Sequence, residues 1–435
     1  MITPNRLVTA ASTSFIGDGL RLTAVPLLAA SITTDPILVA GVIVVERIPW
    51  LLIAPYTASL ADRKDRLRLA AIAQTIRLLL AAVFALLLSL NLSGIVLLYL
   101  FVFLITALET AYDSAVFALV PQVVPDQDLE KVNGRLQAAQ TVSLQFAGPP
   151  AAALLFRIAP ALAFWANSIT FAISALILHR RQPKVSPDAA SDAHQDAQRD
   201  EPAPAASEAN RDNDWRLGIR LVARHAPLRE IAIVLLLLTL SAGAAEAVLV
   251  LFAIERLGLS ELGYSLLFVG MGAGGVLGGL AASRVTALMG TRAAWITSTL
   301  TAALCTLAIA IANSGVLVGA LLTVQGVAVV VANVASVSFR QRIVPLVVMA
   351  RVGAVFRIIA MGCLAVGAGL GGVIASIAGL AAPFILAGVL GFLATVVLAV
   401  RFHTWNGDQI SADPLIKNLT SASGGDAVPP PVKSA

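Results

Sequence analysis

The sequence predicts an all-α integral membrane protein in which twelve transmembrane helices form two halves of six. Of the 435 residues, 58% are hydrophobic and only 13% are charged, whereas soluble domains carry about 25% charged residues. The mean hydropathy is +0.86, so lipid is the expected solvent. Apolar runs long enough to cross a bilayer recur twelve times, and one polar segment divides them into two sets of six.

Each run holds about 20 apolar residues, the length that a helix needs to cross the hydrocarbon core. We expect spans over residues 7–30, 36–59, 69–92, 94–118, 132–156, 159–178, 229–253, 262–285, 293–313, 315–338, 353–377 and 380–401. The first run is too long for the apolar part of a signal peptide, and Asp18 and Arg21 interrupt it, so we expect a retained span. Gly148, Pro149 and Pro150 are expected to bend the fifth span.

The basic residues of the connections set the orientation, because Lys and Arg concentrate on the cytoplasmic side. With the N-terminus in the cytoplasm, the outer connections carry only Arg157 and Arg256. The inner side then carries Arg63, Lys64, Arg66, Arg68, Lys131, Arg135, Arg180, Arg181, Arg284, Arg292, Arg340 and Arg342. The sequence therefore predicts a multi-pass protein of an inner (plasma) membrane with both termini in the cytoplasm.

The expected organisation has four parts, which are an N-terminal six-helix half (1–178), a cytoplasmic linker (179–228), a C-terminal six-helix half (229–402) and a disordered cytoplasmic tail (403–435). Within the linker, residues 182–214 are rich in Ala, Pro, Asp, Glu and Ser, a composition typical of disorder. Residues 215–230 then alternate leucine with arginine. That pattern predicts an amphipathic helix lying on the anionic inner leaflet.

Other classes of protein fit the residues less well. The net charge of +5 does not indicate a nucleic-acid partner, because the basic residues lie beside apolar runs and form no helical stripe. Cys305 and Cys363 lie in apolar runs and the four histidines do not pair at ligand spacing, so we expect no metal site and no cofactor. Residues 270–275 and 367–372 match G-x-G-x-x-G inside apolar spans, which predicts close helix packing rather than nucleotide binding. No catalytic His, Cys or Ser constellation is recognisable, so we expect no enzyme.

The loop between the second and third spans carries a recognisable motif, since residues 58–68 read ASLADRKDRLR. It resembles the motif Gly-x-Leu-Ala-Asp-Arg-x-Gly-Arg-Lys of the major facilitator superfamily. Ala58 and Asp65 replace its two glycines, and the second basic residue is displaced to Arg68. Further stretches resemble the proton-coupled drug-exporter branch, which includes macrolide-efflux and enterobactin-exporter-like proteins, at residues 107–115, 124–140, 146–152 and 339–345. The likeness covers nearly the whole chain except the linker and tail.

The resemblance implies a conformational latch at the cytoplasmic side, formed by Asp62, Arg63, Asp65 and Arg66. In the family the acid equivalent to Asp62 meets the positive N-terminal end of the eleventh span. The arginine equivalent to Arg66 meets an acid near the inner end of the fourth span, where Asp113 lies. These contacts form when the cytoplasmic side is closed. The alternative is that the charges of this loop only anchor the topology.

Charged residues also interrupt the apolar spans. A charged side chain at mid-bilayer costs about 2.5–3.5 kcal/mol on insertion scales, so each one needs a partner or a function. The structural alternatives are an Asp18–Arg21 pair, and a pair between Glu46 and an arginine such as Arg77. The expected set of membrane charge pairs is Glu46, Arg47, Arg77 and Arg357.

In the family fold, spans one, four, seven and ten line a central cavity. On three of these spans lie the residues that we expect to couple transport to protons, which are Asp18, Arg21, Glu109, Asp113 and Glu246. We favour Asp18 and Glu246 as proton carriers, because Glu109 and Asp113 can serve the latch. Residues 262–407 contain no Asp or Glu, so the second half offers no other acid at membrane depth.

The function implied by the resemblance is secondary active transport, with proton-coupled export of amphipathic small molecules or drugs by alternating access. The expected partners are a small-molecule substrate, protons and the lipid bilayer, and the expected functional unit is a monomer. The alternatives are a siderophore or lipid-like exporter, an uncoupled uniporter, and a non-transporting membrane sensor with the linker as its signalling arm.

Overall fold

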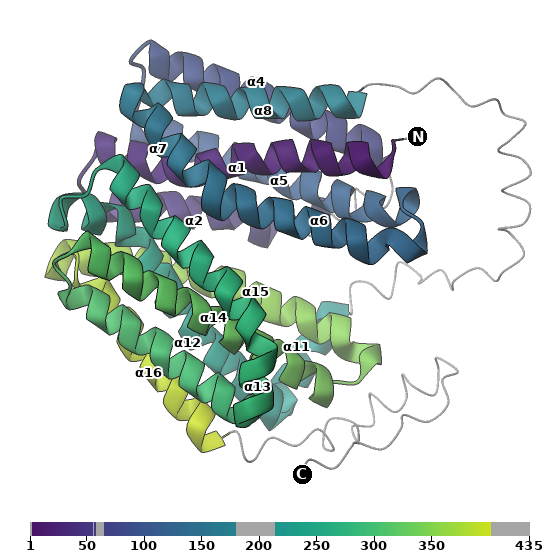
Figure 1. The fold of residues 1–435 in the computed structure, drawn as a ribbon, viewed down its shortest axis with the longest axis vertical. Coiled ribbons are helices and arrows are strands. Elements are labelled where there is room, and N and C mark those ends of the chain that lie inside the picture. The colour runs from purple at the N-terminus through teal and green to yellow at the C-terminus, as the bar shows by residue number, and fades with distance from the viewer. Residues whose placement is uncertain (1, 55, 58–64, 180–213, 402–435) are drawn as a thin grey trace, which may run out of the picture.

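The computed structural model describes residues 2–54, 56–57, 65–179 and 214–401, which are helical apart from short connections (Figure 1). In the first half, five spans are single helices, namely α1 (Pro4–Ile32), α2 (Pro36–Leu52), α4 (Arg66–Ser89), α5 (Ile95–Val123) and α8 (Pro160–His179). A 3₁₀ turn at Asp126–Asp128 leads into the fifth span. That span consists of α6 (Leu129–Thr141), a π-helical segment (Val142–Ala147) and α7 (Gly148–Ile158).

The second half begins after a short helix, α11 (Asp214–Arg224). Its spans are built from α12 (Ala226–Leu251) with a π-helical extension (Phe252–Arg256), α13 (Glu261–Ile311), α14 (Gly315–Ile343), α15 (Leu346–Ala378) and α16 (Ala382–Arg401). α13 holds two spans, because Gly290 has φ 79° and ψ 154° and turns the chain back. This conformation is in the left-handed half of backbone space, which glycine adopts without a steric cost.

Within the described residues the structure has twelve membrane-crossing segments. Nine helices are long and apolar enough to span a bilayer by length and composition. The other three segments are α2, which has 17 residues, the interrupted fifth span, and the second of the two spans in α13. The predicted twelve-helix, all-α membrane fold is therefore confirmed.

The fifth span is irregular where the sequence predicts a bend. Pro149 and Pro150 lack amide hydrogens, so two α-helical hydrogen bonds to the preceding turn cannot form, and the π-helical segment occupies that turn. Next to it, a Cβ atom on Gly148 would lie 2.4 Å from the carbonyl carbon of Gly19. Only two glycines permit this approach, so the irregular segment packs directly on α1.

The two glycine-rich stretches of the second half serve helix packing, as predicted. A Cβ atom on Gly274 of α13 would lie 2.0 Å from the carbonyl oxygen of Thr323 on α14. A Cβ atom on Gly371 of α15 would lie 2.5 Å from the carbonyl oxygen of Ala244 on α12. These backbones touch because no side chain separates them, as is common between membrane helices.

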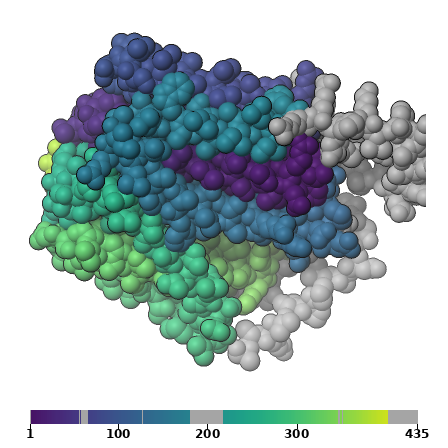
Figure 2. All heavy atoms as spheres, turned by 45° about the horizontal axis from the view of Figure 1, so that its top comes forward, coloured from purple at the N-terminus to yellow at the C-terminus, as the bar shows by residue number. Residues whose placement is uncertain are grey.

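The two halves lie against each other, with α2 packed on α15 and α7 packed on α13. Where α2 begins and α15 ends, a Cβ atom on Gly372 would lie 2.5 Å from the Cβ atom of Ala40. From that end the two bundles diverge toward the end at which the N-terminus lies (Figure 1). Figure 2 shows the face on which the first half, in purple to teal, lies over the green helices of the second half.

The short helix α11, expected to lie on the lipid surface, contacts two helices of the second half, and its position relative to lipid stays a prediction. It packs against α15 and α12, and its Leu221 is only 1% exposed. A Cβ atom on Gly218 would lie 2.6 Å from the carbonyl oxygen of Arg351 on α15. Gly218 and Leu221 of α11 thus face protein, whereas Ile219 is exposed.

Candidate functional site

Arg77 is fully buried in the first half, with a side-chain exposure of 0%. It pairs with Asp18 on α1 and donates to Ser14 Oγ and Gln74 Oε1, each at 3.1 Å. Its guanidinium carbon lies 4.0 Å from the centre of the Phe171 ring on α8. An uncompensated charge at this depth would cost several kcal/mol, so these partners hold α1, α4 and α8 together.

Arg21 extends this network to α2 and α5. Its Nη1 atom lies 3.1 Å from Glu46 Oε1, and its Nη2 atom lies 2.6 Å from Glu109 Oε2. The same Glu109 oxygen lies 4.0 Å from Arg77 Nη2. We call Asp18, Arg21, Glu46, Arg77 and Glu109 the first-half charge cluster. It holds three carboxylates and two guanidiniums, so one carboxylate is in excess when all three are ionised.

The pairs in this cluster differ from the two that the sequence suggests. In place of an Asp18–Arg21 pair along one helix, Asp18 turns to α4 and Arg21 to α2 and α5. Glu46 pairs with Arg21 and not with Arg77. The reason is geometric, since α2, α4 and α5 each bring a side chain of opposite charge to this level of α1.

The latch residues are only partly within the described chain, because Asp62 and Arg63 lie outside it. Asp65 caps α4 by accepting a hydrogen bond of 3.1 Å from the amide of Arg68. Arg66 Nη1 donates to the carbonyl oxygen of Ala118 on α5 at 2.9 Å.

Asp113, the expected partner of Arg66, lies on the same helix as Ala118. Its side chain is half-buried and forms no ion pair or hydrogen bond with the residues that the structure describes. Arg66 thus reaches the fourth span, as the resemblance implies, although its contact there is a backbone carbonyl. The latch itself remains a prediction.

Arg47 and Glu246 form an ion pair between the two halves. Arg47 Nη2 on α2 lies 3.5 Å from Glu246 Oε1 on α12, and the side chains are 22% and 35% exposed. In the sequence the two residues are 199 positions apart. Arg357, the last of the expected membrane charges, is exposed on α15.

A cavity of about 750 Å³ lies between the fifth span and helices α12, α13, α14 and α16. We call it the inter-half cavity. Most of its wall is apolar, with Phe268, Met271 and Phe384 among the larger side chains, and the carboxylate of Glu246 is part of it. Of the five residues expected at a cavity, the structure brings Glu246 to this wall. Asp18, Arg21 and Glu109 belong to the first-half charge cluster.

Uncharged polar side chains complete the wall. Gln325 on α14 donates to Thr306 Oγ1 at 2.8 Å, and Gln145 faces the cavity from the π-helical segment. Gln145 Oε1 is buried and has no hydrogen-bond partner among the described residues. Such an oxygen can accept a hydrogen bond from a bound solute, because leaving it unsatisfied costs about 1–3 kcal/mol.

Gln145 and Gln325 are not among the site residues predicted from the sequence, because that prediction rests on charged residues at membrane depth. The sequence does contain a pattern that could have identified them, since Gln145 and Gln325 each interrupt an apolar run. A polar amide in a span also needs a partner or a function.

Comparison with known proteins agrees with this architecture. The sequence matches the family model described as Major Facilitator Superfamily over residues 7–361. No curated protein sequence matches the chain significantly.

Solved structures of transporters share the fold. The nucleoside transporter NupG superposes with a TM-score of 0.69 at 11% identity, covering 93% of this chain and 99% of its own. A bacterial homologue of the iron transporter ferroportin, in an inward-facing state, gives 0.71 at 15% identity, covering 91% and 98%. A bacterial homologue of the human lysosomal transporter Spinster, inward-facing and unoccupied, gives 0.67 at 14%, covering 94% and 98%. At these identities the likeness establishes the fold alone, whereas the family model covers most of the sequence. The chain belongs to the Major Facilitator Superfamily of multi-pass membrane transporters.

Proposed function

We propose that this transporter exports amphipathic small molecules or drugs across a plasma membrane in exchange for protons, by alternating access. The observation that carries the proposal is the position of Glu246. Its carboxylate is part of the wall of the inter-half cavity and also pairs with Arg47 across the boundary between the halves. The same side chain therefore lines the cavity that would hold the substrate and forms the ion pair that must break for the outer side to open.

The inter-half cavity supports an amphipathic substrate. Its volume of about 750 Å³ falls in the range of pockets that hold drug-sized ligands, which have mostly apolar walls and a few polar groups. Here the apolar wall would accept the body of the substrate. Gln145, Gln325 and Glu246 would orient its polar part by hydrogen bonds.

Proton coupling would follow because different partners compete for the carboxylate of Glu246. While ionised, its carboxylate pairs with Arg47 and holds α2 against α12. A substrate bound in the cavity would draw the carboxylate away from Arg47 and free the two helices to separate. A proton taken up from the outer side would then neutralise the carboxylate and release the substrate, so proton and substrate move in opposite directions. A membrane potential supplies about 2.3 kcal/mol per charge per 100 mV, enough to drive this cycle uphill.

The other cargoes and the other classes of function are alternatives to this proposal. Within the described residues no group of three His, Cys, Asp or Glu side chains is placed to hold a metal ion, so the proposal does not include the iron of the ferroportin homologue. Siderophore or lipid-like cargo and uncoupled uniport remain alternatives within transport. A non-transporting sensor would give no flux at all.

The test is transport by the purified protein in proteoliposomes, with a substrate first found by a drug-susceptibility panel in an efflux-deficient host. Glu246→Gln should abolish uphill transport driven by an imposed pH gradient. Downhill substrate exchange, which needs no net proton movement, should continue. The matched control is Glu130→Gln, which removes a carboxylate that is exposed on α6.

Asp18→Asn tests the second proton carrier that the sequence favours. Asp18 is buried against Arg77, so this variant should lower stability more than coupling. If the Asp18→Asn, Glu246→Gln double variant still transports uphill, neither residue carries the proton, and Glu46 or Glu109 becomes the next candidate. An absence of substrate flux in the wild type would favour the sensor.

A further inference from the structure

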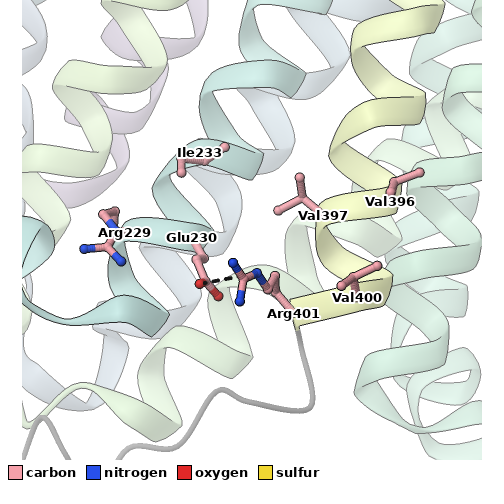
Figure 3. A pocket seen from close by; sticks show the side chains of 7 residues that line it. All are labelled: Arg229, Glu230, Ile233, Val396, Val397, Val400 and Arg401. Atoms are coloured by element: carbon pink, nitrogen blue, oxygen red, sulfur yellow. Dashed lines mark ion pairs between the residues drawn. The ribbon is translucent and has the colours of Figure 1, made fainter.

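A surface groove of about 370 Å³ lies where α12 begins and α16 ends (Figure 3). It is separate from the inter-half cavity and is not part of the proposed transport path. α12 lines it with Arg229, Glu230 and Ile233, and α16 lines it with Val396, Val400 and Arg401. The groove is accessible from outside the protein, since Val400 is 57% exposed and the Arg401 side chain 58%.

Charged and apolar side chains are separated along the groove. On α12, Ile233 lies one helical turn beyond Arg229, toward the middle of the span. On α16, Val396 and Val397 lie one turn before Val400 and Arg401. Figure 3 shows the same order on both helices, with Arg229 and Arg401 toward one end and Ile233, Val396 and Val397 further along, while Val400 lies beside Arg401. A phospholipid has this polarity, with a charged headgroup at the interface and acyl chains in the hydrocarbon.

The charges of the groove favour an anion. Arg401 Nε lies 3.7 Å from Glu230 Oε1, which draws the guanidinium toward α12. Arg229, the residue before Glu230, is exposed and donates to the carbonyl oxygen of Ala223 at 3.3 Å. Among the described residues Glu230 pairs with Arg401, and Arg229 has no carboxylate partner. The planar fork of a guanidinium matches phosphate oxygens.

The groove lies at the end of the bundle that carries the basic connections. The positive-inside rule places that end at the cytoplasmic leaflet, whose anionic lipids are recognised by basic pockets between membrane helices. We propose that this groove binds an anionic phospholipid of the inner leaflet. Arg229 and Arg401 hold its phosphate, and an acyl chain lies along Ile233, Val396 and Val400.

The experiment is native mass spectrometry of the purified full-length protein with added dioleoyl phosphatidylglycerol or dioleoyl phosphatidylcholine. The wild type should retain phosphatidylglycerol at a concentration at which phosphatidylcholine is lost. The Arg229→Gln, Arg401→Gln double variant should need about tenfold more phosphatidylglycerol for the same occupancy. A matched control, Arg135→Gln with Arg284→Gln, removes two exposed arginines elsewhere on the inner side and should bind like the wild type.

A second variant keeps the test decisive if the double glutamine variant fails to fold. Ile233→Trp fills the apolar part of the groove, where Ile233 is 41% exposed, and leaves both arginines in place. It should also weaken retention of phosphatidylglycerol, whereas Arg229→Lys with Arg401→Lys should keep much of it. Equal retention of the two lipids by the wild type overturns the proposal. So does wild-type binding by the Ile233→Trp or double glutamine variant. Neither result bears on proton-coupled export, which the transport assay tests separately.

Discussion

Arg47 on α2 and Glu246 on α12 pair across the boundary between the two halves, with 3.5 Å between Nη2 and Oε1. The close contact of Gly372 with Ala40 joins α15 to the start of α2. The ion pair can therefore persist only while this side of the molecule stays closed. It links the occupancy of the inter-half cavity, which Glu246 lines, to the relative position of the halves.

Arg47→Gln should shift the protein toward a state in which the outer side is open. A partly exposed ion pair contributes on the order of 1 kcal/mol, which corresponds to about a fivefold change in population. Spin labels at Thr34→Cys and Ala378→Cys, in a background without Cys305 and Cys363, should report more of the longer distance in pulsed electron resonance. Arg157→Gln, an exposed arginine near the same end, is the control. An unchanged distance distribution in Arg47→Gln would mean that the pair does not hold the halves together.

Arg77→Met should destabilise the protein strongly, because it leaves Asp18 buried without its cation. Removing one partner of a buried ion pair typically costs about 3–5 kcal/mol, so the purified protein should melt several degrees lower. Adding Asp18→Asn should restore part of the loss, since it removes the unpaired charge. The comparison variant is Arg157→Met at an exposed position. A melting temperature equal to that of the wild type in Arg77→Met would contradict the role of the first-half charge cluster in stability.

Alanine substitutions at two glycines of α13 should change the melting temperature in opposite directions. At Gly274 the new Cβ atom would lie 2.0 Å from the carbonyl oxygen of Thr323, and overpacking of this kind costs about 1–3 kcal/mol. At Gly279 no atom lies within 4 Å of the new Cβ atom, so Gly279→Ala should gain about 0.5–1 kcal/mol from helix propensity. If both variants melt at the same temperature, α13 and α14 can separate without cost at Gly274.

Asp62→Asn should impair transport while expression and substrate binding stay near wild type. The change keeps the size of the side chain but removes the charge that the resemblance places at the N-terminal end of the eleventh span. Transport rate in proteoliposomes and substrate affinity of the purified protein are the two measurements. Asp128→Asn, on the next inner connection, is the control. Wild-type transport by Asp62→Asn would leave the loop as a topology anchor only.

Much of the fold could be predicted because the bilayer imposes a length on every span. The span predicted at 7–30 corresponds to helix Pro4–Ile32, and the span predicted at 380–401 corresponds to helix Ala382–Arg401. The irregularity of the fifth span followed from Pro149 and Pro150, whose backbones cannot donate hydrogen bonds. In the same way, the glycine-rich stretches predicted close helix packing, because only small residues let two helix backbones touch.

The sequence by itself thus determined the solvent, the number of spans and the residues that need a partner, since these depend on local hydrophobicity and on the cost of charge in lipid. Only the tertiary structure decided the partners. Arg21 reaches Glu46 and Glu109, which are 25 and 88 positions away, and Arg47 reaches Glu246 in the other half. Which face of each helix meets which neighbour depends on the packing of the whole bundle. Local sequence does not encode that packing, because several arginines at similar depth could satisfy the same carboxylate.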